Sequence, residues 1–117
     1  MRVCIPTDSP GGPGVPVADS FQDSDLLDFY DEARDGDFVL SVQIRNCAGM
    51  CKDDVETVVR RGAQALIVRG ISSGTLFRFR RSGVQVYRAE EGPAGESLRS
   101  LRTKDLAPAA PSKKKTE

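Results

Sequence analysis

The sequence predicts an α/β fold in which helices pack on a five-stranded mixed sheet. Apolar stretches of strand type occur at five places, and helical stretches with one apolar side follow the last three of them. Turns rich in glycine, proline or aspartate separate these stretches. A length of 117 residues suits one domain with one core.

The first three predicted strands form a meander. Residues 1–6 are an apolar strand that ends at a proline, and residues 7–20, with three prolines and three glycines, form a long loop. Residues 26–32 are the second strand. The Asp35-Gly36 pair is a hairpin signal before residues 38–45, where large apolar side chains alternate with other residues.

Helices and strands alternate in the rest of the chain. Asp53 is a candidate cap for the next helix, with Glu56 three residues later and Gly62 as its stop. Residues 65–68 are fully apolar, which is typical of a buried parallel strand. The remaining elements are a helix after Gly74, a strand over residues 84–87 and a helix that begins at Pro93. The predicted order is therefore β-β-β-α-β-α-β-α.

This order predicts where a binding site lies. After the meander, the strands would be joined by right-handed parallel crossovers. The first, third, fourth and fifth strands would then point the same way. The segments 7–20, 46–52, 70–74 and 89–92 would then emerge at one edge of the sheet. Open α/β sheets bind ligands at the carboxyl ends of their strands, so we expect the site at this edge.

Charge is unevenly distributed along a chain whose formal net charge is zero. Residues 1–40 hold 2 basic and 9 acidic side chains, and residues 41–117 hold 15 basic and 8 acidic ones. The basic part could steer an anion, or the two parts could simply attract each other. The lysine run at 113–115 lies in a Pro/Ala/Ser/Lys stretch, so we predict a domain over 1–106 and a disordered tail over 107–117. Nucleic-acid binding is only weakly supported.

The lengths of the apolar stretches indicate where in the cell the protein is located. No stretch approaches the roughly 18 apolar residues of a membrane span, so no membrane partner is predicted. The apolar start of the chain is too short for a signal peptide. Together with the odd number of cysteines, three, this predicts a cytoplasmic protein with reduced thiols.

Two of these thiols, Cys47 and Cys51, flank Gly49 between the third strand and the next helix. On a regular helix their Cβ atoms would lie about 5–6 Å apart, whereas a disulfide needs roughly 3.5–4.5 Å. A soft metal with bonds of about 2.3 Å to sulfur would bridge them more easily. Without any histidine in the chain, a complete zinc site within one subunit is disfavoured. A silent thiol pair remains the alternative, and we expect Cys4 to be buried in the core.

The turn into the second helix could bind an anion through its free backbone N–H groups. Plain helix capping by Ser72 or Ser73 is the alternative. Nearby basic side chains could add positive charge or could simply be solvated. The candidate ligand-binding residues are Arg45, Gly49, Lys52, Gly70, Ile71, Ser72, Ser73 and Gly74, and the candidate metal ligands are Cys47 and Cys51.

Catalysis finds little support in the sequence. Without histidine, neither a Cys–His pair nor a Ser–His–Asp triad can form. Four aspartates could bind magnesium, but they crowd one loop instead of spreading over several strand ends. They are Asp8, Asp19, Asp23 and Asp25. We therefore predict that the protein is not an enzyme.

Three segments, residues 1–8, 63–72 and 81–87, resemble the dinitrogenase iron–molybdenum cofactor biosynthesis family in order and spacing. The resemblance covers roughly residues 1–103 and implies a ribonuclease H-like fold. It also implies a protein that carries or delivers a metal–sulfur cluster, and one branch, the orange protein, holds a molybdenum–copper–sulfur cluster. Many relatives have a histidine-containing loop after the first strand, whereas this chain has Phe21-Gln22-Asp23-Ser24-Asp25.

The leading hypothesis is a small carrier or scaffold for a metal–sulfur cluster, of the molybdenum–copper–sulfur or iron–sulfur type. Cys47 and Cys51 would contact the soft metal, and a protein client or assembly partner would receive the cluster. Two alternatives stay open from the sequence. One is a partner-binding or regulatory domain without metal, and the other is a thiol redox switch.

Overall fold

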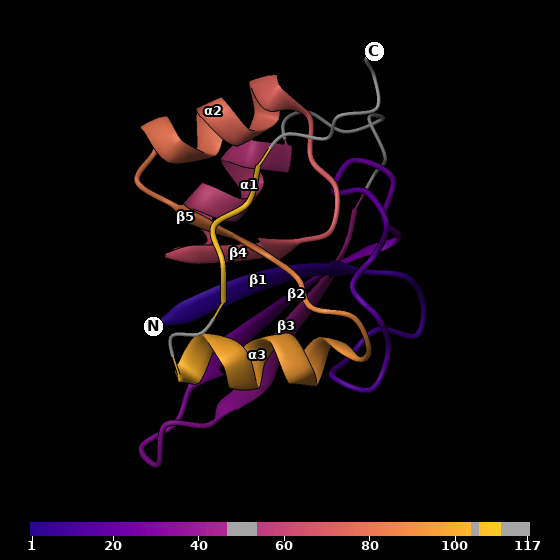
Figure 1. Cartoon of the computed structure of the whole chain (residues 1–117), viewed down its shortest axis with the longest axis vertical. Coiled ribbons are helices and arrows are strands. Elements are labelled where there is room, and N and C mark those ends of the chain that lie inside the picture. The colour runs from indigo at the N-terminus through magenta and orange to yellow at the C-terminus, as the bar shows by residue number, and fades with distance from the viewer. Residues whose placement is uncertain (47–53, 104–105, 111–117) are drawn as a thin grey trace.

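The computed structural model describes residues 1–46, 54–103 and 106–110 (Figure 1). Its five strands form one sheet in the order β3-β2-β1-β4-β5. The strands are β1 (Arg2–Thr7), β2 (Leu26–Glu32), β3 (Phe38–Arg45), β4 (Ala65–Val68) and β5 (Gln85–Arg88). The helices are α1 (Asp54–Arg60), α2 (Ser73–Arg81) and α3 (Ala94–Arg102). The predicted element order and the five-stranded α/β architecture are confirmed.

The strand directions place four strand ends at one edge of the sheet. Strand β2 is antiparallel to both β1 and β3, whereas β4 is parallel to β1 and β5 is parallel to β4. The chain therefore leaves β1, β3, β4 and β5 at the same edge, as the sequence predicted. This edge includes the ends of the parallel strands, where α/β proteins bind ligands.

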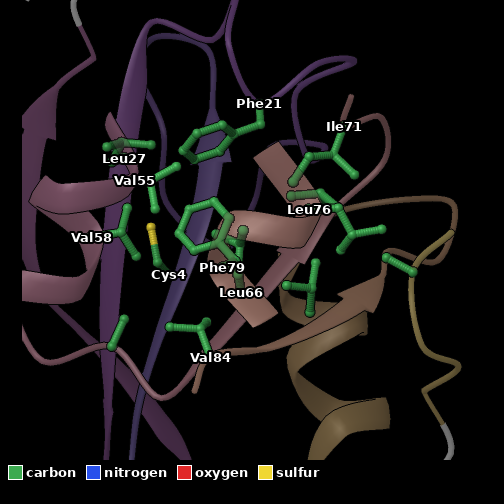
Figure 2. Packing of buried hydrophobic residues seen from close by; sticks show 14 of the residues in the cluster. Cys4, Phe21, Leu27, Val55, Val58, Leu66, Ile71, Leu76, Phe79 and Val84 are labelled. Atoms are coloured by element: carbon green, nitrogen blue, oxygen red, sulfur yellow. The ribbon is translucent and has the colours of Figure 1, made fainter. Parts of the chain in front are cut away.

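Helices cover both faces of the sheet (Figure 1). Helices α1 and α2 lie over one face, and Figure 2 shows the apolar cluster beneath them, which includes Phe21, Leu66 and Phe79. The rings of Phe21 and Phe79 meet edge to face with centroids 5.3 Å apart, a favourable aromatic geometry. Helix α3 covers the other face, where Leu98 packs in a second apolar cluster.

Cys4 belongs to the core and not to the edge. It is fully buried in the cluster under α1 and α2 (Figure 2), while its neighbours Val3 and Ile5 point to the opposite face, as strand alternation requires. Burial, with a smaller contribution from the charge of Asp28, raises the pKa of the Cys4 thiol well above its ordinary value. The expected burial of Cys4 is confirmed, and its thiol is a packing group.

The segment 106–110 is hydrogen-bonded through its backbone to the free edge of β5. Arg88 N donates to Ala107 O at 2.8 Å, and Ala109 N donates to Val86 O at 3.0 Å. Leu106 and Ala109 are buried. Residues 107–110 were expected in a disordered tail, but these pairs fix them on the sheet because they satisfy the exposed edge of β5. Residues 111–117 lie outside the described residues.

Candidate functional site

The long loop between β1 and β2, residues 8–25, is hydrogen-bonded to two other segments at the predicted edge. Phe21 N donates to Gly70 O at 2.9 Å, which joins the loop to the turn before α2. Val15 O accepts from Ala94 N, at the start of α3, at 2.7 Å. Loops that follow different strands are therefore held together by backbone bonds, and the predicted convergence is present in the described residues.

Asn46 fixes the point at which the chain leaves β3. Its side chain is only 5% exposed, and Nδ2 donates to Phe21 O at 2.9 Å and to Ser24 Oγ at 2.8 Å. Its backbone N donates to Asp25 O at 2.8 Å. The carboxamide oxygen, Oδ1, is buried without a hydrogen-bond partner among the described residues. The segment that contains the cysteine pair therefore starts from a rigid, buried anchor.

The cysteine pair itself follows this anchor directly. Cys47, Gly49, Cys51 and Lys52 lie outside the described residues. The chain is described again from Asp54, where α1 begins. The structure therefore describes the residues on either side of this segment, at the end of β3 and at the start of α1. The roles of the four residues stay predictions.

Ser72 acts as the N-cap of α2. Its backbone is extended, with φ −71° and ψ 155°, and its Oγ accepts from Thr75 N at 3.3 Å. Gln22 on the long loop donates through Nε2 to Ser72 Oγ at 3.0 Å and to Thr75 Oγ1 at 2.8 Å. The hydroxyl of Ser72 is thus used for capping, which is the alternative that the sequence left open.

The other residues of this turn have different positions. Ile71 is 2% exposed and packs in the core cluster (Figure 2), so its side chain does not face the edge. Ser73 and Gly74 are exposed, and their backbone N–H groups have no hydrogen-bond partner in the described part of the chain. A Cβ atom added at Gly74 would meet nothing within 4 Å. The turn therefore offers backbone donors at Ser73 and Gly74 without a steric need for glycine.

Exposed arginines at this edge occur at the ends of β3, β4 and β5. Arg45 ends β3 and has no ion pair among the described residues. Arg69 follows β4, and its Nη1 lies 3.1 Å from Asp19 Oδ1. Among the described residues, Arg45 is therefore available for a bound anion.

The aspartates of the long loop mainly shape the loop itself. Asp8 Oδ1 accepts from Asp25 N at 3.2 Å, and Asp25 Oδ2 accepts from Ser9 N at 3.1 Å. Across residues 1–46, 54–103 and 106–110, no group of three or more His, Cys, Asp or Glu side chains could hold a metal ion. The described residues thus give no support to a magnesium site.

A buried aspartate on β2 is a feature that the sequence analysis missed. Asp28 is fully buried, and its Oδ2 accepts from Thr7 Oγ1 at 2.9 Å and from Gly12 N at 2.8 Å. These bonds pin the long loop onto the sheet. Beside it Gly11 has φ +74°, and an added Cβ would lie 2.4 Å from Gln43 Nε2. The available signal was a charged residue between the apolar pairs Leu26-Leu27 and Phe29-Tyr30 of the strand.

The family model described as dinitrogenase iron-molybdenum cofactor matches residues 1–104 of the chain. The chain belongs to the dinitrogenase iron-molybdenum cofactor family. The resemblance of its three short segments is thereby confirmed. No sequence among the curated proteins matches the chain.

Solved structures share the fold of this family member at low sequence identity. The apo form of the orange protein from Desulfovibrio gigas has a TM-score of 0.75 at 14% identity, with 94% of this chain and 93% of that chain covered. A candidate NifB protein from Thermotoga has a TM-score of 0.72 at 22% identity, with 92% and 91% covered. A candidate dinitrogenase from Methanocaldococcus jannaschii has a TM-score of 0.71 at 16% identity, with 96% and 97% covered.

In this member of the family, Phe21 and Gln22 between β1 and β2 have structural roles. Phe21 fills the core and Gln22 holds the start of α2. Among the described residues, no helix has the length and apolar character needed to cross a membrane.

Proposed function

We propose that this protein binds and carries a metal–sulfur cluster at the edge formed by residues 46–52 and 70–74. The observation that carries the proposal is the double role of Phe21. Its carbonyl accepts from the buried Asn46, and its N–H donates to Gly70. The entry to the cysteine pair and the start of α2 are thereby tied to one residue. Membership in a family named after the iron–molybdenum cofactor supports the same reading.

The groups at this edge suit a cluster with its own sulfide ligands better than a bare ion. Thiolates of Cys47 and Cys51 would bind a soft metal, but two thiolates leave a single ion short of ligands. A cluster that brings sulfide fills the remaining positions and is usually anionic. The N–H groups of Ser73 and Gly74 and the guanidinium of Arg45, which are exposed, would offset that charge.

The cluster type and the role of the protein follow from the same proposal. A molybdenum–copper–sulfur or an iron–sulfur cluster fits thiolate ligands, and the shared fold of the orange protein supports the first. The protein would act in the cytoplasm as a carrier or scaffold and not as an enzyme, and a client protein would receive the cluster. The sheet order β3-β2-β1-β4-β5, with β2 antiparallel, supports the ribonuclease H-like classification.

Reconstitution tests the proposal directly. Apo protein is mixed anaerobically with tetrathiomolybdate and copper(I), or with iron and sulfide, and is then desalted. We expect a visible absorption band and stoichiometric metal with one of the two mixtures. The double variant Cys47→Ser and Cys51→Ser should lose this uptake, whereas Cys4→Ala, which removes the buried core thiol, should keep it. Equal metal uptake by the double variant would show that the thiols are not the ligands.

A further inference from the structure

A cavity lies at the C-terminal end of α3, between this helix and the sheet. Its volume is about 350 Å³, which is within the range of roughly 300–1,000 Å³ that small-molecule sites occupy. Its apolar wall is formed by Met1, Phe38, Tyr87, Leu101 and Leu106. The size and the lining of this cavity both suit a small ligand.

The cavity is separate from the edge that includes the cysteine segment. Met1 precedes β1, Glu32 ends β2 and Phe38 begins β3. In Figure 1, the N-terminus lies beside the end of α3 that contributes to the cavity. The chain leaves β1 and β3 at the opposite edge of the sheet, where the proposed cluster site lies. A ligand in this cavity would therefore bind without contacting that site.

Four parts of the chain enclose the cavity. Phe38 belongs to β3, Tyr87 to β5, Leu101 to α3 and Leu106 to the segment 106–110. These side chains belong to the second apolar cluster or pack against it, so the wall is continuous with the core. A flat partner surface reaches such a concave wall poorly, whereas a small apolar molecule can transfer its surface from water onto it.

The charged groups of the wall already have partners. Arg102 Nη1 donates to Asp37 Oδ1, and Arg102 Nη2 donates to Asp35 O at 2.9 Å. Glu32 Oε1 lies 3.6 Å from the amino group of Met1. A charged ligand would lose its hydration in this cavity without meeting an unpaired counter-charge among the described residues, which is costly. The wall therefore favours an uncharged molecule.

We infer that this cavity binds an uncharged apolar small molecule. Its body would lie against Phe38, Tyr87 and Leu101, which offer both aromatic and aliphatic contacts. The same molecule would contact Leu106, which belongs to the segment 106–110 whose backbone is hydrogen-bonded to β5. Binding should therefore also hold this segment on the sheet.

Two fluorescent dyes with one aromatic frame test the inference. N-phenylnaphthylamine is uncharged, and anilinonaphthalenesulfonate is its sulfonated, anionic analogue. Each dye is titrated into the wild-type protein, and its emission is measured. We expect stoichiometric binding of the neutral dye, about tenfold or more tightly than the anionic dye, because the sulfonate loses hydration without gaining a partner.

Three substitutions locate the site and test the role of charge. Phe38→Trp enlarges a half-buried wall residue and should weaken binding of the neutral dye by about tenfold. Val39→Trp places the same residue at the neighbouring position, which is 56% exposed, and should bind this dye like wild type. Asp37→Asn removes the ionic partner of Arg102, so the anionic dye should bind about threefold more tightly and the neutral dye as before.

Leucine methyl resonances of the wild-type protein locate the dye without any substitution. The neutral dye should shift the methyl signals of Leu101 and Leu106, which line the cavity. The signals of Leu66 and Leu76, in the cluster under α1 and α2, should stay in place. This measurement decides the location of the dye if Phe38→Trp does not fold.

Several results would overturn the inference. These are no stoichiometric binding of the neutral dye, equal or tighter binding of the anionic dye by wild type, or equal binding of the neutral dye by Phe38→Trp and Val39→Trp. Shifts at Leu66 and Leu76 in place of Leu101 and Leu106 would assign the dye to the other cluster. Self-association of the wild-type protein that Phe38→Trp abolishes would assign the cavity to a second copy of the chain.

Discussion

Replacement of Asn46 by alanine removes the side chain that anchors the chain just before Cys47. The variant loses two hydrogen bonds from Nδ2, to Phe21 O at 2.9 Å and to Ser24 Oγ at 2.8 Å. Phe21 O still accepts from Ser24 Oγ at 3.2 Å, so neither partner is left fully unsatisfied. The loss therefore corresponds to two ordinary buried hydrogen bonds.

The expected loss of stability is moderate. At about 0.5–1.5 kcal/mol for each bond, the two bonds contribute about 1–3 kcal/mol. Alanine also removes the buried Oδ1, which has no partner among the described residues, and this relieves part of the desolvation cost. We expect a net destabilisation of about 1–2 kcal/mol, which lowers the urea midpoint by about 0.5–1 M at a slope of about 2 kcal/mol per M.

Urea unfolding followed by circular dichroism measures this change. Gln43→Ala is the matched control, because Gln43 is an exposed β3 residue whose Nε2 donates to Pro10 O at 3.3 Å. Its midpoint should stay close to that of wild type. An unchanged midpoint for Asn46→Ala would refute the anchoring role. Under the proposed function, this variant should also bind the cluster more weakly although both thiols remain.

Two further predictions concern the core thiol and an ion pair. Cys4→Ser places a hydroxyl in an apolar cluster and should lower the free energy of unfolding by about 1–3 kcal/mol; a native protein that iodoacetamide labels at Cys4 as fast as at Cys47 and Cys51 would contradict the burial. The hydrogen bond from Arg2 lowers the pKa of Asp31 to about 2 from 3.8. The pair therefore stabilises the folded state above pH 3.8, and this stabilisation is lost as the pH falls towards 2. Because the Asp31 side chain is 42% exposed, the effect should be at most about 1 kcal/mol. Between about pH 6 and about pH 3, the urea midpoint of Asp31→Asn should decrease less than that of wild type. An equal decrease in both proteins would exclude the effect.

Local patterns were sufficient to predict the sheet. The predicted bounds of β2, β3 and β4 agree with the structure, because alternation and continuous apolar runs are properties of neighbouring residues. The ends of β1 and β5 lie one residue later than predicted. Thr7 extends β1 because it pairs with Leu26 on β2, and such pairing depends on a residue far along the chain.

The site was predictable only in outline. Strand directions follow from element order, so the converging loops could be predicted. The bonds that hold them could not, because Asp28 meets Gly12 and Asn46 meets Phe21 across 16 and 25 residues. The sequence left Ser72 open between capping and anion binding, and the bond from Thr75 N to Ser72 Oγ assigns it to capping. The packing of residues 106–110 on β5 likewise has no signal in composition.

The described bonds at this edge join segments that are far apart in the chain. They join Phe21 to Gly70, Asn46 to Phe21 and Gln22 to Ser72, and neither Cys47 nor Cys51 contributes to them. Serine is similar to cysteine in size, so serine at both thiol positions should leave the urea midpoint close to that of wild type. With the fold unchanged, loss of metal uptake in that double variant reports on ligand chemistry. The stability measurement thus turns the reconstitution experiment into a specific test of the thiolates.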